Sequence, residues 1–317
     1  MNVSRLMPTA AIAAAAALGL TALTACSTAD TADRTNGDGL DVVASFYPMQ
    51  FLAERIGGTH VSVTTLTKPG QEPHDLELSP RQIGGLTDAG LVLYLKGIQP
   101  AVDDAVELSG ARHALDASQL TTLEDHGTEV GAEEHGHEHH GGAAGADPHV
   151  WLDPVRYAEI AKGVGKSLEK ADPGHAADYR KNTTALVAQL DELNTAFENG
   201  LRTTATRTFI TTHSAFGYLA ERYGLTQEGI AGVDPEADPS PARISEIHAI
   251  AKKDKATTVF FETLASDRTA KTLAQDTGLR TDVLDPLEGI TKQSKGTDYL
   301  EVMRSNLAAL QKALGAK

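Results

Sequence analysis

Cysteine is almost missing from this sequence: among 317 residues there is one, Cys26. A chain with a single cysteine cannot form an intramolecular disulfide, so its core must be large enough to stabilise the fold without cross-links. Aromatic residues are also scarce, at 5% of the chain with one tryptophan, and no long repeat is present. The length of the chain suits two domains.

Basic residues are in deficit. Lys and Arg number 28 against 43 Asp and Glu, which gives a formal net charge of −15 with histidine neutral. The basic footprint that nucleic-acid binding requires is therefore absent, and we predict no nucleic-acid partner. An excess of acidic residues favours solubility and raises the local concentration of cations.

The N-terminus carries an apolar run, Ala11 to Leu23, that is too short to span a membrane. Arg5 precedes it and Leu23-Thr24-Ala25-Cys26 follows, which resembles the bacterial lipoprotein processing signal. We predict a lipoprotein signal peptide over residues 1–26, acylation of Cys26, and a flexible tether over 27–39. The mature protein would then be exported and lipid-anchored on the outer face of the cytoplasmic membrane. The alternative is an ordinary signal peptide with an accidental cysteine.

From residue 40 onward, short apolar segments alternate with segments of helical periodicity. The predicted strands cover 41–47, 61–66, 91–95, 208–212, 257–261 and 281–284. This alternation predicts an α/β fold with mostly parallel sheets. Between the two groups of strands, an apolar stripe predicts a helix from Pro173 to Asn199, about 40 Å long. We therefore expect an N-terminal lobe over 40–171, a linking helix over 172–202 and a C-terminal lobe over 203–317.

A histidine-rich loop, residues 124–142, lies within the N-terminal lobe. It mixes histidine with acidic residues and glycine, and it holds too little apolar surface to form a core. Neutral imidazole binds borderline transition metals, so the loop is a candidate secondary metal site, with a solvated linker as the alternative. Its candidate ligands are His126, His135, His137, His139 and His140.

Four further residues lie at or near the ends of apolar segments, two in each half: His74, His149, His213 and Asp285. Three imidazoles and one carboxylate suit zinc. His149 is held between Pro148 and the bulky Val150-Trp151-Leu152, as a preorganised ligand should be. Because the four are far apart in sequence, they can form one site only if the two halves face each other across a cleft.

With these residues the chain resembles the zinc-binding solute-binding lipoproteins of ABC metal importers, the cluster A-I or cluster 9 family, over roughly residues 41–317. The motifs that carry the resemblance are Ser45-Phe46-Tyr47-Pro48, Pro73-His74-Asp75, Asp147-Pro148-His149-Val150-Trp151, Thr212-His213-Ser214-Ala215-Phe216 and Leu284-Asp285-Pro286-Leu287. One departure from commoner relatives is Leu287-Glu288-Gly289 directly after Asp285-Pro286.

The resemblance implies two α/β lobes joined by a long rigid linking helix, with the metal in the cleft. It implies that His74, His149, His213 and Asp285 are the metal ligands. It also implies a function: a monomeric, non-enzymatic protein that captures Zn(II) with high affinity and delivers it to an ABC permease and its ATPase subunit.

Three alternatives remain at this stage. Manganese- or iron-binding members of the same family are similar, but the manganese-binding relatives carry a carboxylate where His213 stands. A zinc hydrolase would need an open coordination position that Asp285 would close; the sequence has no His-Glu-x-x-His motif, and Glu262 is the only extra acid placed to act as a base. A surface adhesin with incidental metal is the third.

Overall fold

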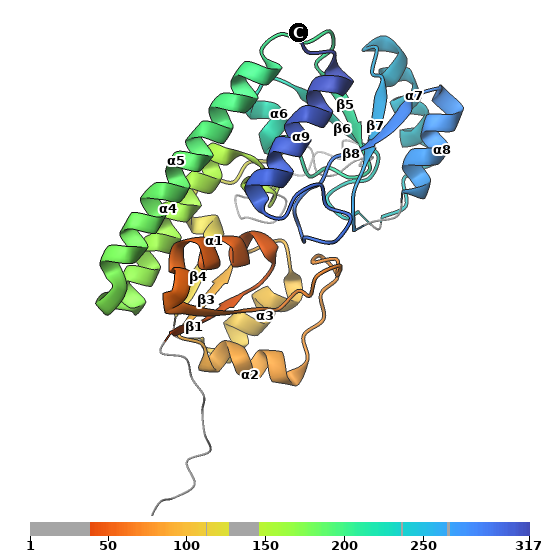
Figure 1. Cartoon of the computed structure of the whole chain (residues 1–317). Helices are drawn as coiled ribbons and strands as arrows, with labels where there is room; N and C mark the ends of the chain where they lie inside the picture. The colour runs from red at the N-terminus through yellow and green to blue at the C-terminus, as the bar shows by residue number, and fades with distance from the viewer. Residues whose placement is uncertain (1–38, 112, 127–145, 236, 265–266) are drawn as a thin grey trace, which may run out of the picture. The chain divides into compact units, whose positions relative to one another are not determined.

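Two parallel four-stranded sheets form the framework of the computed structural model, which describes residues 39–111, 113–126, 146–235, 237–264 and 267–317 (Figure 1). The first sheet has the order β2-β1-β3-β4 and the second the order β6-β5-β7-β8. The strands of the first sheet are β1 (Leu40–Ala44), β2 (Val61–Thr65), β3 (Leu91–Tyr94) and β4 (Ala114–Asp116). The strands of the second sheet are β5 (Thr208–Thr211), β6 (Thr226–Gly229), β7 (Thr258–Phe261) and β8 (Arg280–Val283).

Helices connect the strands and cover the sheets, so the predicted α/β fold with two lobes is confirmed. The central strands are apolar because both of their faces are covered: Val42, Val43 and Ala44 of β1 are all buried. The helices are α1 (Tyr47–Gly57), α2 (Pro80–Asp88), α3 (Pro100–Ser109), α4 (Pro154–Ala171), α5 (Ala176–Leu201), α6 (Gly217–Arg222), α7 (Pro241–Lys253), α8 (Arg268–Thr277) and α9 (Tyr299–Leu314).

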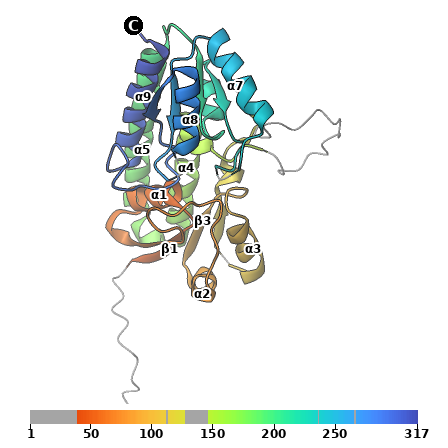
Figure 2. The ribbon, with the colours of Figure 1, turned by 90° about the vertical axis from the view of Figure 1, so that its right-hand side faces the viewer.

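The long helix α5 runs beside α4 and extends from the first lobe to the second (Figures 1 and 2). It begins three residues later than expected, because Pro173–His175 form a separate 3-10 turn. Its 26 residues correspond to about 39 Å at 1.5 Å per residue. At one end Asn182 Nδ2 donates to the carbonyl of Ile56 in α1, and at the other Gln311 Nε2 of α9 donates to the carbonyl of Gly200. The helix therefore contacts both lobes, as a linking helix must.

One hydrophobic core continues from α1 and β1 through α4 and α5 to α9. Trp151, fully buried, lies where the lobes meet: its Nε1 donates to the carbonyl of Pro286 at 2.7 Å, and Tyr299 OH donates to the carbonyl of Trp151 at 2.5 Å. Smaller clusters cover the outer faces of the two sheets, around Leu86 and around Ile247. Residues Asp38–Lys317 accordingly form one compact unit that contains both lobes.

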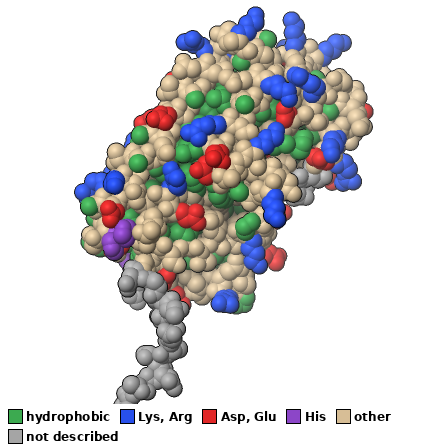
Figure 3. All heavy atoms as spheres, viewed as in Figure 1, with side chains coloured by type: hydrophobic (Ala, Val, Ile, Leu, Met, Phe, Trp, Pro, Cys, Tyr) green, Lys and Arg blue, Asp and Glu red, His purple; other side chains and the backbone are tan. Residues whose placement is uncertain are grey.

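The predicted signal peptide, including Cys26, and the tether up to residue 38 lie outside the described residues. Within the described ranges, no helix has both the length and the apolar character needed to cross a bilayer. On the face drawn in Figure 3, acidic and basic side chains are interspersed despite the net charge of −15.

Candidate metal centre

Four side chains from four separate loops converge between the lobes: His74, His149, His213 and Glu288. One ligand atom from each lies within 4.8 Å of all the others. The Nε2 atoms of His149, His213 and His74 are 3.2, 3.4 and 3.5 Å from a single oxygen, Oε1 of Glu288. Three of these side chains are completely buried, and that of His74 is 11% exposed. The structure thus brings together the three histidines that the sequence singled out.

The four loops each follow a strand, and ligands of α/β folds collect at the carboxyl ends of strands. His74 lies in the loop after β2, and His149 lies beyond β4, just before the 3-10 turn Val150–Leu152. In the second lobe, His213 is two residues past β5, and Glu288 follows β8. Each lobe therefore contributes two donors, which is the division expected from the sequence, although one of the four residues differs.

Asp285 is not part of this group. Its Oδ2 accepts a hydrogen bond from Thr263 Oγ1 at 3.1 Å, and its Oδ1 accepts one from the backbone N–H of Leu287 at 2.9 Å. The side-chain amide of Asn306 also binds the backbone of Asp285: its Oδ1 accepts from the N–H of Asp285, and its Nδ2 donates to the carbonyl of Asp285. Burial raises the pKa of Asp285, although the hydrogen bonds it accepts oppose the rise. Asp285 thus stabilises its own loop, and Glu288 is the carboxylate that lies among the three histidines; the role of Asp285 as a ligand stays a prediction.

The loop after β8 bends at Glu288-Gly289, directly after Leu287. Leu287 has φ of 60°, in the left-handed region that is uncommon for a residue other than glycine. In this loop the carboxylate of Glu288, three residues after Asp285, lies among the histidines. The signal available in the sequence was the Leu287-Glu288-Gly289 departure, which placed a second acid in the same loop.

Asp147 orients His149. Its Oδ1 is 2.8 Å from Nδ1 of His149 and also accepts the backbone N–H of the same residue at 2.9 Å. Carboxylates that bind one ring nitrogen in this way direct the other nitrogen toward a metal. Burial disfavours the charged form of His149, but its hydrogen bonds with Asp147 and Glu288 outweigh burial and raise its pKa.

Glu262 has the corresponding role for His213. Its Oε1 lies 2.6 Å from Nδ1 of His213 and accepts a hydrogen bond from Thr212 Oγ1 at 2.5 Å. The carboxylate that the hydrolase alternative would have used as a base is therefore engaged in holding an imidazole. Burial opposes the charge on His213, but Glu262 and Glu288 together raise its pKa well above the ordinary value.

The buried group is electrostatically poised for a cation. Burial alone would raise the pKa of Glu288, but the three surrounding imidazoles hold it well below the usual range. Close by, burial and the charge of Glu288 raise the pKa of Glu72 to about 9. Three buried atoms of the group have no hydrogen-bond partner among the described residues: His74 Nε2, His213 Nε2 and Glu288 Oε2. Such atoms are costly to bury, and a metal ion would satisfy all three.

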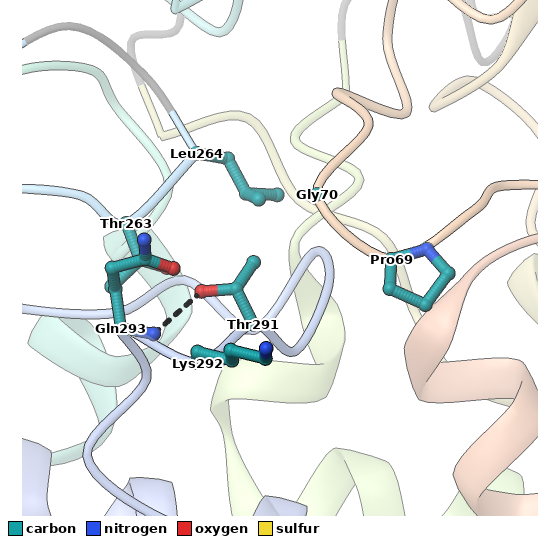
Figure 4. Close-up of a pocket in the computed structure, with 7 residues that line it drawn as sticks. All are labelled: Pro69, Gly70, Thr263, Leu264, Thr291, Lys292 and Gln293. Atoms are coloured by element: carbon teal, nitrogen blue, oxygen red, sulfur yellow. Dashed lines mark hydrogen bonds between the residues drawn. The ribbon is translucent and has the colours of Figure 1, made fainter.

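The donor set fits zinc, which takes imidazole nitrogen and carboxylate oxygen in four-coordinate sites. Two cavities are each lined by residues of both lobes. One, of about 140 Å³, reaches Glu288 itself between Tyr47 and Ile290. The other, of about 500 Å³, lies between Pro69-Gly70 of the first lobe and Thr263, Leu264, Thr291, Lys292 and Gln293 of the second (Figure 4). There the backbone N–H of Gln293 donates to Thr291 Oγ1 at 3.0 Å and closes a tight turn at the rim.

Of the predicted secondary ligands, only His126 lies in the part of the chain that the structure describes. It is separate from the main group and hydrogen-bonded to Asp147 and Glu221. His135, His137, His139 and His140 lie outside the described residues.

A family model described as zinc-uptake complex component A, periplasmic, matches residues 42–313. The chain belongs to this family. It is 37% identical over 288 residues to the high-affinity zinc uptake system protein ZnuA of Bacillus subtilis, across 89% of this chain and 90% of that protein. It is 34% identical to the zinc-binding lipoprotein AdcA of Streptococcus pneumoniae across 86% of this chain, but spans only 55% of AdcA.

A solved structure is similar as well. The Zn(II)-bound crystal structure of an AdcAII mutant variant of Streptococcus pneumoniae superposes with a TM-score of 0.76 at 31% identity, over 88% of this chain and all of that one. Membership in the zinc-uptake component A family confirms the resemblance seen in the sequence. The family is the substrate-binding component of ABC zinc transport and not an enzyme family, so the expectation of a transport function is confirmed at that level.

Proposed function

We propose that this chain captures Zn(II) with high affinity and passes it to an ABC permease that works with an ATPase subunit. The observation that carries the proposal is the convergence of three imidazole Nε2 atoms on one oxygen of Glu288, at 3.2 to 3.5 Å. A histidine must be neutral to bind a metal, so zinc binding at such a group depends on pH and weakens as the imidazoles become protonated.

The zinc ligands in this proposal are His74, His149, His213 and Glu288. Glu288 replaces Asp285 because its carboxylate touches all three imidazoles, whereas both oxygens of Asp285 accept hydrogen bonds within its own loop or from Thr263. Four protein donors would close the coordination sphere, an arrangement that suits binding and release rather than activation of a water.

Three nitrogen donors favour zinc over manganese, both because imidazole is a softer ligand than carboxylate and because zinc stands higher in the general affinity order of divalent metals. The fully buried His213, which supplies the third nitrogen, is the residue that separates this site from the alternative of a manganese- or iron-binding member of the family.

For its place in the cell, we propose acylation at Cys26 and attachment to the outer face of the cytoplasmic membrane, as a monomer. Support comes from the Leu23-Thr24-Ala25-Cys26 signal, from the periplasmic description of the family and from the lipoprotein name of AdcA. Labelling with a radioactive fatty acid tests the anchor: Cys26→Ala should abolish the label and release the protein from the membrane fraction. Retention of Cys26→Ala in that fraction would argue against the lipid.

Elemental analysis followed by competitive zinc titration tests the function and the ligand set. Wild type should retain about one tightly bound zinc per chain. Glu288→Gln should lower the affinity for zinc by more than the ~10–100-fold that removal of a carboxylate behind a ligand costs. Asp285→Asn should lower the affinity for zinc less than Glu288→Gln does. The reverse order of the two variants would restore Asp285 as the ligand. Zinc-dependent turnover of esters or peptides would instead support the hydrolase.

A further inference from the structure

A buried amide lies in the apolar face of α9. Asn306 is 2% exposed, and Met303 and Leu310, which precede and follow it on the same face of the helix, are fully buried. An amide in such a place costs free energy unless both its donor and its acceptor have partners. An apolar side chain would serve the packing of the helix equally well, so the amide indicates a further role.

Both polar atoms of Asn306 bind the backbone of a single residue, Asp285. Its Oδ1 accepts from the N–H of Asp285 at 3.0 Å, and its Nδ2 donates to the carbonyl of Asp285 at 2.7 Å. Because each hydrogen bond has a preferred length and direction, the pair restricts both the position and the orientation of this backbone segment. The loop after β8 is thereby attached to α9.

The chain between Asp285 and Glu288 is bound at each step. Trp151 Nε1 donates to the carbonyl of Pro286 at 2.7 Å, and the N–H of Leu287 donates to Asp285 Oδ1 at 2.9 Å. Glu288 comes three residues after Asp285, so at most roughly 10 Å of chain separates the two residues. Over such a short and fixed connection, a displacement of Asp285 also displaces Glu288.

Helix α9 gives Asn306 a rigid support. It packs against the linking helix α5, and near its C-terminal end Gln311 Nε2 donates to the carbonyl of Gly200. At its beginning, Asp298 caps the helix by accepting a backbone N–H at 2.9 Å. Glu288, in contrast, lies in a loop between β8 and α9. A ligand on a loop keeps its geometry better when a regular element supports it.

We propose that Asn306 is a positioning residue for zinc binding: by attaching the backbone of Asp285 to α9, it places the carboxylate of Glu288 among the three histidines. This inference rests on the proposed function, in which Glu288 is a zinc ligand. Within the described residues, no hydrogen bond joins Asn306 to the histidine–glutamate group. Its effect on zinc therefore passes through the loop.

Asn306→Leu tests the proposal, because leucine has the same branched skeleton as asparagine and removes both hydrogen bonds. The N–H and carbonyl of Asp285 would then be buried without these partners, and the loop would shift to satisfy them. We expect the affinity for zinc to fall by about 10-fold, the lower end of the cost of removing a partner that supports a metal ligand. Asn306→Ser, which keeps a hydroxyl, should lose less, and it decides the question if Asn306→Leu does not fold.

Competitive zinc titration of the full chain measures these affinities, in a parent that carries alanine at His135, His137, His139 and His140. Asn182→Leu is the matched control. Its Nδ2 also donates to a backbone carbonyl, that of Ile56, but at the end of α5 that contacts α1. The affinity of this control for zinc should stay within about 2-fold of the parent's.

A double-mutant cycle separates positioning of Glu288 from a general loss of structure. In a Glu288→Ala background, Asn306→Leu should change the affinity for zinc by less than about 2-fold, because the carboxylate that it positions is already gone. In a His74→Ala background, the loss of about 10-fold should remain.

Equal losses from Asn306→Leu with and without the carboxylate of Glu288 would overturn the proposal, since Asn306 would then act on the fold as a whole. An unchanged affinity in an Asn306→Leu variant that keeps its circular dichroism spectrum would overturn it as well. If Glu288→Ala lowers the affinity for zinc and Asn306→Leu does not, the proposed function stands and only this inference fails. If Glu288→Ala binds zinc as the parent does, the proposed ligand set fails and the inference fails with it.

Discussion

The two lobes have the same strand order, but they contribute residues to the histidine–glutamate group from different loops. In the first lobe, β2-β1-β3-β4, these residues follow the second and fourth strands of the chain. In the second, β6-β5-β7-β8, they follow the first and fourth. His149 and Glu288 therefore stand at equivalent positions, whereas His74 and His213 do not. A shared topology places the loops at the cleft, but it does not decide which loop carries a donor.

The supporting carboxylates differ in the same way. Asp147 is two residues from His149, so a single tripeptide sets their geometry, and it also caps a backbone N–H there. Glu262 is 49 residues from His213 and lies just past β7, so its position depends on the pairing of β5 with β7. The orientation of His149 is thus set by a neighbour in sequence, whereas the orientation of His213 is set by a residue that the sheet brings close.

The largest effect should come from breaking one of the contacts that join the lobes. Trp151→Ala removes a fully buried side chain and its hydrogen bond to Pro286, so we expect a loss of ~3–5 kcal/mol in the free energy of unfolding. Urea denaturation of the metal-free protein measures it. Leu108→Ala, at a side chain that is 86% exposed, is the control and should change stability by less than about 0.5 kcal/mol. A loss from Trp151→Ala no larger than the control's would mean that the lobes are held together elsewhere.

The sequence predicted most of the framework because the central strands are apolar runs. The predicted segments 41–47, 61–66, 91–95, 208–212, 257–261 and 281–284 each contain or overlap a strand. The strands it missed, β4 and β6, are edge strands of three and four residues with sequences Ala-Leu-Asp and Thr-Gln-Glu-Gly. The edge strands β2 and β8 were predicted, so position at the edge is not the reason. The short sequences of β4 and β6 carry neither an apolar run nor a clear alternation, so periodicity could not reveal them.

The three histidines of the site could be predicted from the sequence, but the carboxylate among them could not. His74, His149 and His213 follow strands and could be found by position. Glu288 could not, because it shares one loop with Asp285, and the sequence does not show which of the two carboxylates that loop brings to the histidines. Leu287 in this loop has a positive φ, which is rare for a non-glycine residue. The role of Glu262 behind His213 was equally hidden, since it requires knowing that β5 and β7 are neighbours.

Removing each supporting carboxylate should sharpen the contrast between local and sheet-based support. Asp147→Asn and Glu262→Gln should each lower zinc affinity by about 10–100-fold, because the imidazole behind the metal loses its charged partner. We expect the larger loss for Asp147→Asn, since Asp147 also caps the backbone of His149. Competitive titration measures both, with Glu107→Gln as the control. If the two variants bind zinc as wild type does, these carboxylates do not position the ligands.

Replacing His213, which lies two residues past β5, with a carboxylate should alter the selectivity between zinc and manganese. His213→Glu exchanges a nitrogen for a carboxylate that can bind through both oxygens, which suits manganese better. Zinc should still bind more tightly, but the zinc-to-manganese affinity ratio should fall by about 10-fold. The titration uses a background with alanine at His135, His137, His139 and His140. An unchanged ratio would place His213 outside the coordination sphere.

The smallest expected effect on stability comes from the carboxylates in the fourth strand of each lobe, which have different partners. In β4, Asp116 accepts hydrogen bonds from the backbone N–H groups of Lys96 and Ser118. In β8, Asp282 pairs instead with Lys295 at 3.0 Å and Lys312 at 2.8 Å, which connects the strand to the loop after Glu288 and to α9. The second arrangement relies on exposed charges, so salt should weaken it.

For Asp282, burial opposes ionisation, but the hydrogen bonds from Lys312 and Lys295 lower its pKa to about 2. A carboxyl whose pKa is lower in the folded than in the unfolded chain stabilises the fold above its unfolded pKa, about 3.9, and loses that contribution as the pH falls through the folded value. Asp282→Asn should therefore cost at most about 1 kcal/mol at pH 7 in low salt. The cost should shrink in 1 M NaCl and as the pH is lowered from 4 toward 2. Urea denaturation across these conditions measures it, and a cost independent of both salt and pH would show that the loop after β8 is held by packing rather than by this ion pair.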